Sequence, residues 1–246
     1  MTDSLVINEI YLSLQGESTW AGQPCVFIRL TGCNLRCSYC DTAYAFSAGT
    51  KMSIQEMMAE VERLASPYQG RTMSDGGILP LVELTGGEPL LQPNALPLMR
   101  ELCDRGFTVL LETSGAHDIS KVDARVRRIM DLKCPSSGEV ARNRFENLPH
   151  LKPTDEIKFV IGTLDDYEWA KEQVTTHRLN TLCPLLFSWV SPLQPHQQEK
   201  SLKRVPDGQT PISRRDLVER IVADALPVRF QLQLHKFIWP PDQKGV

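Results

Sequence analysis

Short runs of apolar residues alternate along the chain with longer segments in which apolar residues recur at helical spacing. Apolar runs between turn formers are typical of buried strands, and a 3.6-residue period is typical of amphipathic helices. The pattern predicts strands at 25–30, 81–84, 108–111, 128–132, 156–161, 184–190 and 230–234. It predicts helices at 53–64, 94–103, 163–177 and 213–226. Because strands that alternate with helices form a mostly parallel sheet, the predicted fold class is α/β.

Capping signals support the predicted helices. At the start of three predicted helices, a Ser or Thr is followed three positions later by an acidic residue. The pairs are Ser53 with Glu56, Thr163 with Asp166 and Ser213 with Asp216. In this arrangement each side chain can accept a hydrogen bond from the backbone N–H of the other residue, which satisfies donors in the first turn. Gly106 is expected to end the helix that begins at residue 94.

Three connecting segments have no clear element of their own. The segment 118–128 is short for a helical crossover, and 66–79 and 194–211 are expected to be excursions over the surface. No repeat or low-complexity tract divides the chain. We therefore expect one domain that spans residues 1–246.

The overall composition argues against several classes of protein. The chain has 27 Lys and Arg against 30 Asp and Glu, so it lacks the basic excess that would neutralise nucleic-acid phosphates. No apolar run reaches the ~18 residues of a membrane span. The N-terminal residues lack the basic and apolar regions of a signal peptide. We therefore expect a cytoplasmic protein with reduced thiols, and with no nucleic-acid or membrane partner.

Polar and glycine-rich clusters directly follow the predicted strands. They lie at 33–40, 85–89, 112–115, 131–137 and 191–194. The carboxyl ends of parallel strands meet at one edge of a sheet, where α/β folds place their active sites. Any one cluster is equally consistent with a turn, but the five together indicate a functional site at this edge.

Three of the seven cysteines, Cys33, Cys37 and Cys40, form a C-x3-C-x2-C pattern. A structural zinc site takes four ligands, usually in two separated pairs; here no second pair exists and the first histidine is His117. Three thiolates that leave one position open suit an iron–sulfur cluster whose fourth iron takes another ligand. Zinc with a distant ligand and three buried structural thiols remain as alternatives.

The cysteine pattern, with Tyr39 before its last cysteine and Gly86-Gly87-Glu88-Pro89 downstream, resembles the signature of radical S-adenosylmethionine (SAM) enzymes. The resemblance implies an incomplete, TIM-like (β/α) barrel with mostly parallel strands. It also implies a 4Fe–4S cluster on the three cysteines, with SAM bound to the fourth iron. In this superfamily one-electron reduction then releases a 5′-deoxyadenosyl radical.

Residues at positions that match the superfamily are expected to bind SAM. They are Tyr39, Asp41, Gly87, Glu88, Ser114, Lys133, Ser136 and Gln194. Gly86 and Gly87 permit close approach of the backbone to a ligand, and Glu88 or nearby carbonyls can accept a hydrogen bond from the methionine ammonium. Ser114 and Gln194 are included only for their place at the edge of the sheet.

Further motifs narrow the resemblance. Leu14-Gln15-Gly16-Glu17, Arg29 and Cys40-Asp41-Thr42 resemble the family of 7-carboxy-7-deazaguanine synthases, and the likeness runs nearly from end to end. That family acts in queuosine biosynthesis. It converts 6-carboxy-5,6,7,8-tetrahydropterin to 7-carboxy-7-deazaguanine with loss of ammonia, and SAM is regenerated.

The family resemblance also implies a Mg²⁺ ion, bound by Thr42 and by the substrate carboxylate. Magnesium prefers oxygen ligands and usually keeps substrate and water ligands. The implied substrate-binding residues are Leu14, Gln15, Gly16, Glu17, Arg29 and Thr85. Their chemistry suits an anionic, donor-rich heterocycle, since an arginine can pair with a carboxylate through two hydrogen bonds. No catalytic side chain is expected beyond the cluster ligands.

Two other functions stay open at this stage. An activase that places a glycyl radical on a partner protein would share the cysteines, but it has no use for the 14–17 stretch or for Thr42. A non-catalytic iron–sulfur or zinc module would not cleave SAM. The resemblance further implies a homodimer and a flavodoxin-like electron donor. Cys25, Cys103, Cys134 and Cys183 are expected to be small buried residues, and His235 to be structural.

Overall fold

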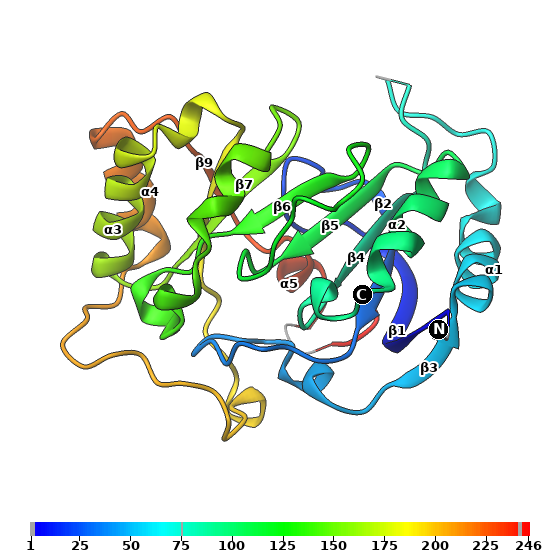
Figure 1. The fold of residues 1–246 in the computed structure, drawn as a ribbon. Coiled ribbons are helices and arrows are strands. Elements are labelled where there is room, and N and C mark those ends of the chain that lie inside the picture. Colours follow the sequence, from blue (N-terminus) through cyan, green and yellow to red (C-terminus); the bar gives the residue numbers. More distant parts are fainter. Residues whose placement is uncertain (1–2, 75, 241–242) are drawn as a thin grey trace.

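A nine-stranded sheet runs through the protein (Figure 1). The computed structural model describes residues 3–74, 76–240 and 243–246. The strands, in chain order, are β1 Ser4–Leu14, β2 Pro24–Leu30, β3 Thr50–Ser53, β4 Leu81–Gly86, β5 Val109–Thr113, β6 Arg127–Asp131, β7 Glu156–Ile161, β8 Leu185–Trp189 and β9 Arg229–Gln231. They lie in the order β3-β1-β2-β4-β5-β6-β7-β8-β9.

The sheet is mostly parallel and open. All neighbours from β2 to β9 are parallel, whereas β1 pairs antiparallel with both β2 and β3. In the described part of the chain β3 and β9 form the two edges, and they do not pair with each other. The predicted α/β class and incomplete barrel are therefore confirmed.

Four helices pack along one face of the sheet. They are α1 Ile54–Ala65, α2 Ala95–Asp104, α3 Leu164–Thr176 and α4 Arg214–Ala223. Figure 1 shows α1 and α2 at the end of the sheet that carries β1, and α3 and α4 at the end that carries β9. The predicted capping boxes of α1 and α3 are present in full, and Ser213 accepts a hydrogen bond from the backbone of Asp216.

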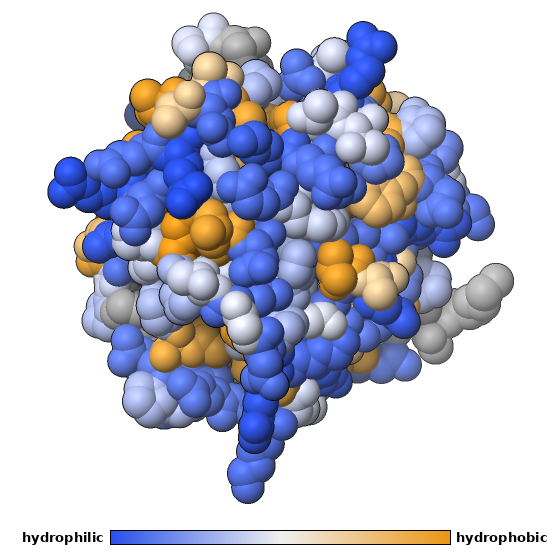
Figure 2. Space-filling view, turned by 90° about the vertical axis from the view of Figure 1, so that its left-hand side faces the viewer, coloured by the Kyte–Doolittle hydropathy of each residue, from blue (hydrophilic) through white to orange (hydrophobic). Residues whose placement is uncertain are grey.

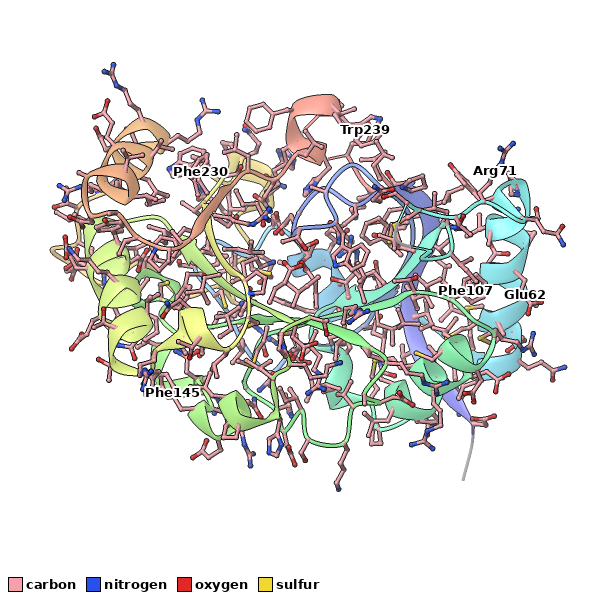
Figure 3. All side chains as sticks on the ribbon, turned by 90° about the horizontal axis from the view of Figure 1, so that it is seen from above. Glu62, Arg71, Phe107, Phe145, Phe230 and Trp239 are labelled. Atoms are coloured by element: carbon pink, nitrogen blue, oxygen red, sulfur yellow. The ribbon has the colours of Figure 1, made fainter. Side chains whose placement is uncertain are left out.

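The two faces of the sheet differ in chemistry because successive strand residues point to opposite sides. The residues that face the helices belong to one buried apolar cluster, which includes Ile28, Leu84, Leu111 and Phe159. Partly buried aromatic side chains join this layer at separate points, as the labelled Phe107, Phe145 and Phe230 show (Figure 3). Each fully buried side chain of this size contributes about 1.5–3 kcal/mol to stability. The opposite, concave face carries charged residues in the same strands, and this is where the site lies.

Two strands and one short helix were not predicted. The alternation of β1 is broken by a bulge between Ile7 and Glu9, so its apolar residues do not keep a constant period of two. β3 has only four residues, two of them exposed. The strand predicted at 230–234 ends at Gln231, and the short helix α5 His235–Ile238 follows after residues 232–234.

The segment 194–211 is more than a surface excursion. The backbone N–H of Lys203 donates to the carbonyl of Arg36 at 2.8 Å, and the Lys203 ammonium pairs with Glu139 at 2.9 Å. The segment therefore crosses beside the cysteine loop. The face of the molecule that includes α3 and α4 is mainly hydrophilic, with scattered apolar residues (Figure 2). Within the described ranges, no helix has the length and apolar character needed to span a membrane.

Candidate active site

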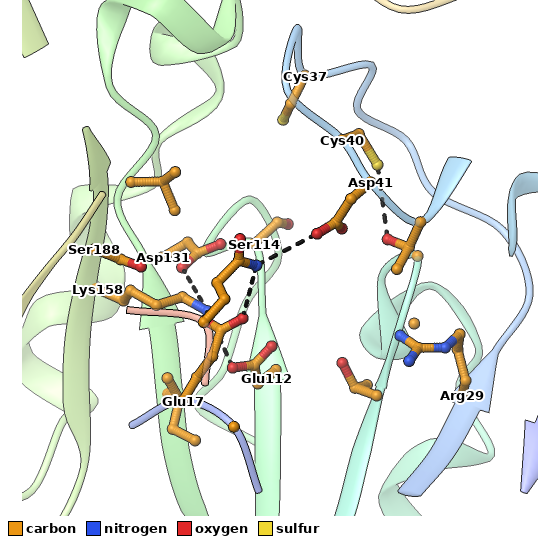
Figure 4. A pocket seen from close by; sticks show the side chains of 18 of the residues that line it. Glu17, Arg29, Cys37, Cys40, Asp41, Glu112, Ser114, Asp131, Lys158 and Ser188 are labelled. Carbon is orange, nitrogen blue, oxygen red and sulfur yellow. Dashed lines mark hydrogen bonds and ion pairs between the residues drawn. The ribbon is translucent and has the colours of Figure 1, made fainter. Parts of the chain in front are cut away.

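A cavity opens on the concave face of the sheet, beneath the cysteine loop (Figure 4). Most of the residues predicted to form the site line this cavity. They are Leu14, Gln15, Gly16, Glu17, Arg29, Cys33, Cys37, Tyr39, Cys40, Asp41, Thr42, Thr85, Gly87, Ser114 and Lys133. Residues that are far apart in the sequence, from the N-terminal loop to β6, thus meet in one place.

The cysteine loop follows β2 and holds three free thiols. The backbone N–H of Leu35 donates to Cys33 Sγ at 3.4 Å. The Arg36 guanidinium donates to the carbonyls of Cys33 and Leu35 and stacks on Phe46 at 4.1 Å, which fixes the shape of the loop. Burial raises the pKa of each thiol, that of Cys40 to about 11.

This donor set fits a metal cluster. Metal ligation deprotonates a coordinating thiol, so a bound cation overcomes the effect of burial on the thiol pKa. The N–H···S contact at Cys33 is typical of a thiolate ligand. The phenol oxygen of Tyr39 is buried at the cavity without a hydrogen-bond partner in the described part of the chain, which suits a polar ligand beside it.

The glycine pair after β4 lets two loops touch. A Cβ on Gly87 would lie 1.9 Å from the carbonyl oxygen of Gly32 and 3.0 Å from Cys33 Cβ. Gly86 has φ +126°, a conformation that L side chains rarely adopt, and a Cβ there would lie 2.3 Å from the carbonyl oxygen of Leu30. Only glycine permits this approach, so the pair places the backbone of residues 86–87 against the first cysteine.

Glu88 lies next to this pair but does not line the cavity. Its side chain is fully buried and its carboxylate accepts hydrogen bonds from the backbone N–H of Leu90 and Ser114 and from the hydroxyls of Thr113 and Ser114. Every acceptor direction is thus used inside the protein. Glu88 connects the ends of β4 and β5 and orients Ser114, which does line the cavity.

Two other predicted SAM-binding residues also lie outside the cavity lining. Ser136 is buried, and its hydroxyl and backbone N–H both donate to Asp166 at the start of α3. Gln194 is exposed and caps a short 3₁₀ turn through its contacts with Gln197. Ser136 supports the cysteine loop instead, since its carbonyl accepts a hydrogen bond from the Ser38 hydroxyl at 2.7 Å.

Charged side chains of the strands form a buried layer at the inner end of the cavity. Lys158 of β7 lies 3.0 Å from both Glu17 and Glu112 and 3.6 Å from Asp131 (Figure 4). Gln15 donates to Glu83, which is 2% exposed. Burial, followed by the charge of the neighbouring Glu112, raises the pKa of Glu83 well above its ordinary value.

Sequence reasoning did not assign a role to Glu83, Glu112, Asp131 or Lys158. The signal was present, because each is a charged residue in a strand that also carries buried apolar residues. A charge at such a position is costly unless it faces a polar site. His235, which was expected to be structural, also lines the cavity.

Arg29 lies on the opposite side of the cavity from Lys158 (Figure 4), and Thr42 lines the cavity beside Cys40. The Arg29 guanidinium donates to Glu9 at 2.7 Å and to the Tyr11 hydroxyl at 2.8 Å, which leaves its other N–H donors for a ligand. Thr42 Oγ1 lies 3.7 Å from Cys40 Sγ. Between Thr42 and the cysteine, Asp41 is held by Lys236 and Gln233.

Comparison with known proteins gives concordant matches. The model of the radical SAM superfamily matches residues 27–136. A 7-carboxy-7-deazaguanine synthase from Koribacter versatilis is 46% identical over 242 residues, which cover 98% of this chain and 99% of the relative. A synthase of the same name from Chlorobaculum tepidum is 42% identical over 245 residues, which cover 98% of this chain and 97% of the relative.

Solved structures support the fold. The crystal structure of QueE from Escherichia coli matches with a TM-score of 0.67 and 22% identity, covering 94% of this chain and 95% of that one. Streptococcus suis SuiB, solved bound to SAM, matches with a TM-score of 0.54 and 16% identity, covering 82% of this chain and 48% of that one. At these identities the likeness is one of fold.

Proposed function

The chain belongs to the family of 7-carboxy-7-deazaguanine synthases, and from this premise we propose that it converts 6-carboxy-5,6,7,8-tetrahydropterin to 7-carboxy-7-deazaguanine with loss of ammonia. As a radical SAM enzyme it uses a 4Fe–4S cluster and SAM. The observation that carries the proposal is that the three thiols and the 14–17 loop line the same cavity. A cluster-binding module alone would not need that loop.

Different residues of this cavity bind the cluster, SAM and the substrate. Cys33, Cys37 and Cys40 hold the cluster, and the backbone at Gly87 contacts bound SAM. The cluster and SAM together supply the reductive cleavage that starts radical chemistry on the substrate. Arg29 pairs with the substrate carboxylate through its free N–H donors, and Glu17 accepts hydrogen bonds from the guanidine-like edge of the pterin. The enclosed cavity keeps water and competing hydrogen donors away.

We extend the proposal to magnesium, bound by Thr42 and the substrate carboxylate. Thr42 supplies one neutral oxygen ligand at the cavity wall, which suits an ion that keeps water and substrate oxygens around it. Arg29 also lines the cavity and would neutralise the second oxygen of that carboxylate.

The partners and compartment follow from the family resemblance. We propose a homodimer that receives electrons from a flavodoxin-like protein and works in the cytoplasm. Free thiols at Cys25, Cys103, Cys134 and Cys183, all buried, are consistent with a reducing compartment. We also propose that residues 1–246 form one radical SAM domain, which the single continuous sheet supports.

The decisive experiment is anaerobic reconstitution with iron and sulfide, followed by reaction with SAM, Mg²⁺, a reductant and the tetrahydropterin. The proposal expects a product with the mass of 7-carboxy-7-deazaguanine and one equivalent of ammonia. The Cys37→Ala variant, prepared in the same way, is the control and should retain little iron and form no product. SAM cleavage by the wild type without any pterin-derived product would overturn the proposal and favour another radical SAM activity.

A further inference from the structure

Lys158 lies in the charged layer of the cavity, and the reaction described above gives it no role. Ile157, Phe159 and Ile161 of β7 face the helices, so Lys158 points to the concave face. Its side chain is only 6% exposed. Because a buried ammonium is costly unless carboxylates compensate it, the contacts of Lys158 indicate what it does.

Three carboxylates from separate elements surround the Lys158 ammonium (Figure 4). Nζ lies 3.0 Å from Glu17 Oε2, 3.0 Å from Glu112 Oε1 and 3.6 Å from Asp131 Oδ1. Asp131 also pairs with Lys133. In the part of the chain that the structure describes, Glu17 and Glu112 have ion pairs with Lys158 only.

Lys158 keeps Glu17 ionised in a buried place. Burial raises the pKa of Glu17, but the charge of Lys158, followed by His235 and a hydrogen bond from Gln233, lowers it to about 2. Gln233 Nε2 donates to the other carboxylate oxygen at 3.0 Å. Burial lowers the pKa of Lys158 itself, yet the carboxylates around it raise that pKa well above the ordinary value.

We propose that Lys158 is a positioning residue for the substrate, which holds the carboxylates of Glu17 and Glu112 side by side to accept hydrogen bonds from the amino-pyrimidinone edge of the pterin. Both carboxylates contact the same nitrogen and both line the cavity. Lys158 occupies one oxygen of each carboxylate. Gln231 and Gln233 also donate to Glu17, so Glu112 keeps more acceptor directions for the ligand than Glu17 does. This inference rests on the proposed function, since it assumes a donor-rich heterocycle as substrate.

A purely structural role is the competing explanation. In that case Lys158 only neutralises buried carboxylates, and its loss would lower stability, cluster content and all activities together. A positioning role predicts a selective effect, because the two carboxylates nearest to Lys158, those of Glu17 and Glu112, are not among the residues expected to bind SAM. The Michaelis constant for the pterin should change while SAM cleavage without substrate does not.

Three variants separate these explanations. Lys158→Met removes the charge at similar volume, Lys158→Arg keeps the charge, and Lys171→Met is the matched control on the outer surface. Lys171 is 38% exposed and pairs with Asp224 on α4. Each protein is reconstituted and compared by iron content, by melting temperature, by 5′-deoxyadenosine formation without pterin, and by KM and kcat for the pterin between pH 6 and 8.

The expected result is a rise of about tenfold or more in KM for Lys158→Met, with kcat and unassisted SAM cleavage within about threefold of the wild type. Without Lys158 only His235 and Gln233 oppose the burial of Glu17, so its pKa should rise and KM should increase as the pH falls from 8 to 6. Lys158→Arg should keep the wild-type pH dependence even if its KM is higher, and it remains informative if the methionine variant does not fold.

Other titratable groups face this site and must be considered. They are Glu83 of β4, Asp131 and Lys133 at the end of β6, Glu156 of β7 and His235 of α5. All are present in both the wild type and Lys158→Met. Lys158 also lowers the pKa of Glu83, Glu156 and Glu112, the last of which has a pKa of about 7, so the pH profiles are compared again in the Glu17→Gln background, where any difference that these groups cause persists.

A double-mutant cycle with Glu17→Gln completes the test. If Lys158 acts through Glu17, then Lys158→Met should raise KM much less in the Glu17→Gln background than in the wild type. Unchanged KM in Lys158→Met, or a parallel loss of pterin turnover, SAM cleavage and stability in both Lys158 variants, would overturn the inference. These outcomes require a wild type that turns over the pterin, so a wild type that forms no product contradicts the proposed function instead.

Discussion

At the scale of single residues, several groups that support the site never face its cavity. Glu88 is the best example, because its carboxylate receives hydrogen bonds from the loops after β4 and after β5. Family resemblance suggested contact with SAM at this position. The hydrogen bonds suggest a different role, in which Glu88 fixes the backbone that surrounds the ligand.

Replacing Glu88 with glutamine tests this role. The amide would direct donors at groups that are themselves donors, so we expect the free energy of unfolding to fall by about 2–3 kcal/mol. Urea unfolding of the cluster-free protein measures this change. Glu101→Gln on α2 is the control and should have little effect, because the Glu101 side chain is 42% exposed and pairs with Arg105 at the surface. Wild-type stability with lost SAM affinity would instead favour direct contact between Glu88 and SAM.

Thr42→Ala tests the magnesium site. The hydroxyl is the proposed protein ligand, so the variant should need more Mg²⁺ for half-maximal pterin turnover, by about tenfold. SAM cleavage in the absence of substrate should be retained, since the cysteines and the glycine pair are unchanged. A magnesium titration identical to that of the wild type would exclude Thr42 as the ligand.

The raised pKa of Glu112 predicts that the free energy of unfolding depends on pH. Burial, only partly offset by Lys158, raises this pKa from 4.5 to about 7. Between these values the folded protein holds a proton that the unfolded chain releases, so stability falls as the pH rises from about 4.5 to 7. The shift corresponds to about 3 kcal/mol at most.

Glu112→Gln removes this pH dependence. The variant should therefore gain stability relative to the wild type at pH 8 and show little gain at pH 5, as measured by urea unfolding of the cluster-free proteins. Glu146→Gln, a substitution of an exposed glutamate, provides the comparison. An equal difference at both pH values would contradict the raised pKa.

The cysteine loop and the glycine pair could be predicted from sequence because the residues of each lie within a few positions of one another in the chain. Lys158 and Glu83 could not be placed with the same certainty, since an isolated charge in a strand shows its partners only after the sheet has formed. Gln194 was assigned from its position at the edge of the sheet, and Ser136 from its match to the superfamily. Neither signal tells whether a side chain points into the cavity or, as for Ser136, toward α3.

At the scale of elements, the start of α3 is linked to the cysteine loop. Asp166 is fully buried and accepts hydrogen bonds from the backbone N–H of Ser136, Gly162 and Thr163 at 2.7, 2.8 and 3.0 Å. The turn at 135–137 in turn contacts the cysteine loop, where the N–H of Ser38 donates to the carbonyl of Ser137 at 3.1 Å. A helix cap thus supports the cluster ligands.

Asp166→Asn should therefore do more than weaken a helix. We expect a loss of about 2–3 kcal/mol in the free energy of unfolding, together with lower iron content after reconstitution. Asp216→Asn is the matched control, because Asp216 holds the same position in α4 but is exposed. It should cost about 1 kcal/mol or less and leave iron content unchanged. Equal effects of the two substitutions would contradict the proposed link between the start of α3 and the cysteine loop.

The element pattern was predictable where periodicity was regular. All seven parallel strands from β2 onward were predicted with β9 shortened, and the first capping residues of α1, α3 and α4 were located correctly. β1 was not predicted, because a bulge interrupts the alternation of its apolar and polar residues. Its pairing with β2 and β3 depends on contacts across the sheet, which no local window of sequence contains.

At the scale of the whole molecule, the site depends on both ends of the chain. The 14–17 loop follows the N-terminal strand, and His235 and Val246 from the C-terminal region line the same cavity. The backbone N–H of Leu234 donates to the carbonyl of Gly16 at 2.8 Å. The sheet between these regions is continuous, so the protein should fold as one cooperative unit.

This cooperativity predicts a single unfolding transition for the cluster-free protein. Circular dichroism in the far-ultraviolet and tryptophan fluorescence should give the same midpoint in urea, because Trp20 packs against buried residues of β2, β4, β5 and β6 and Trp189 belongs to β8. Different midpoints for the two signals would contradict a single domain.

The most direct test of the account is the low-temperature electron paramagnetic resonance spectrum of the reduced, anaerobically reconstituted protein, recorded with and without SAM. The account predicts a reduced 4Fe–4S signal that changes shape when SAM is added, because three cysteines leave one iron open to it. A signal that is identical in the presence and absence of SAM would contradict the account.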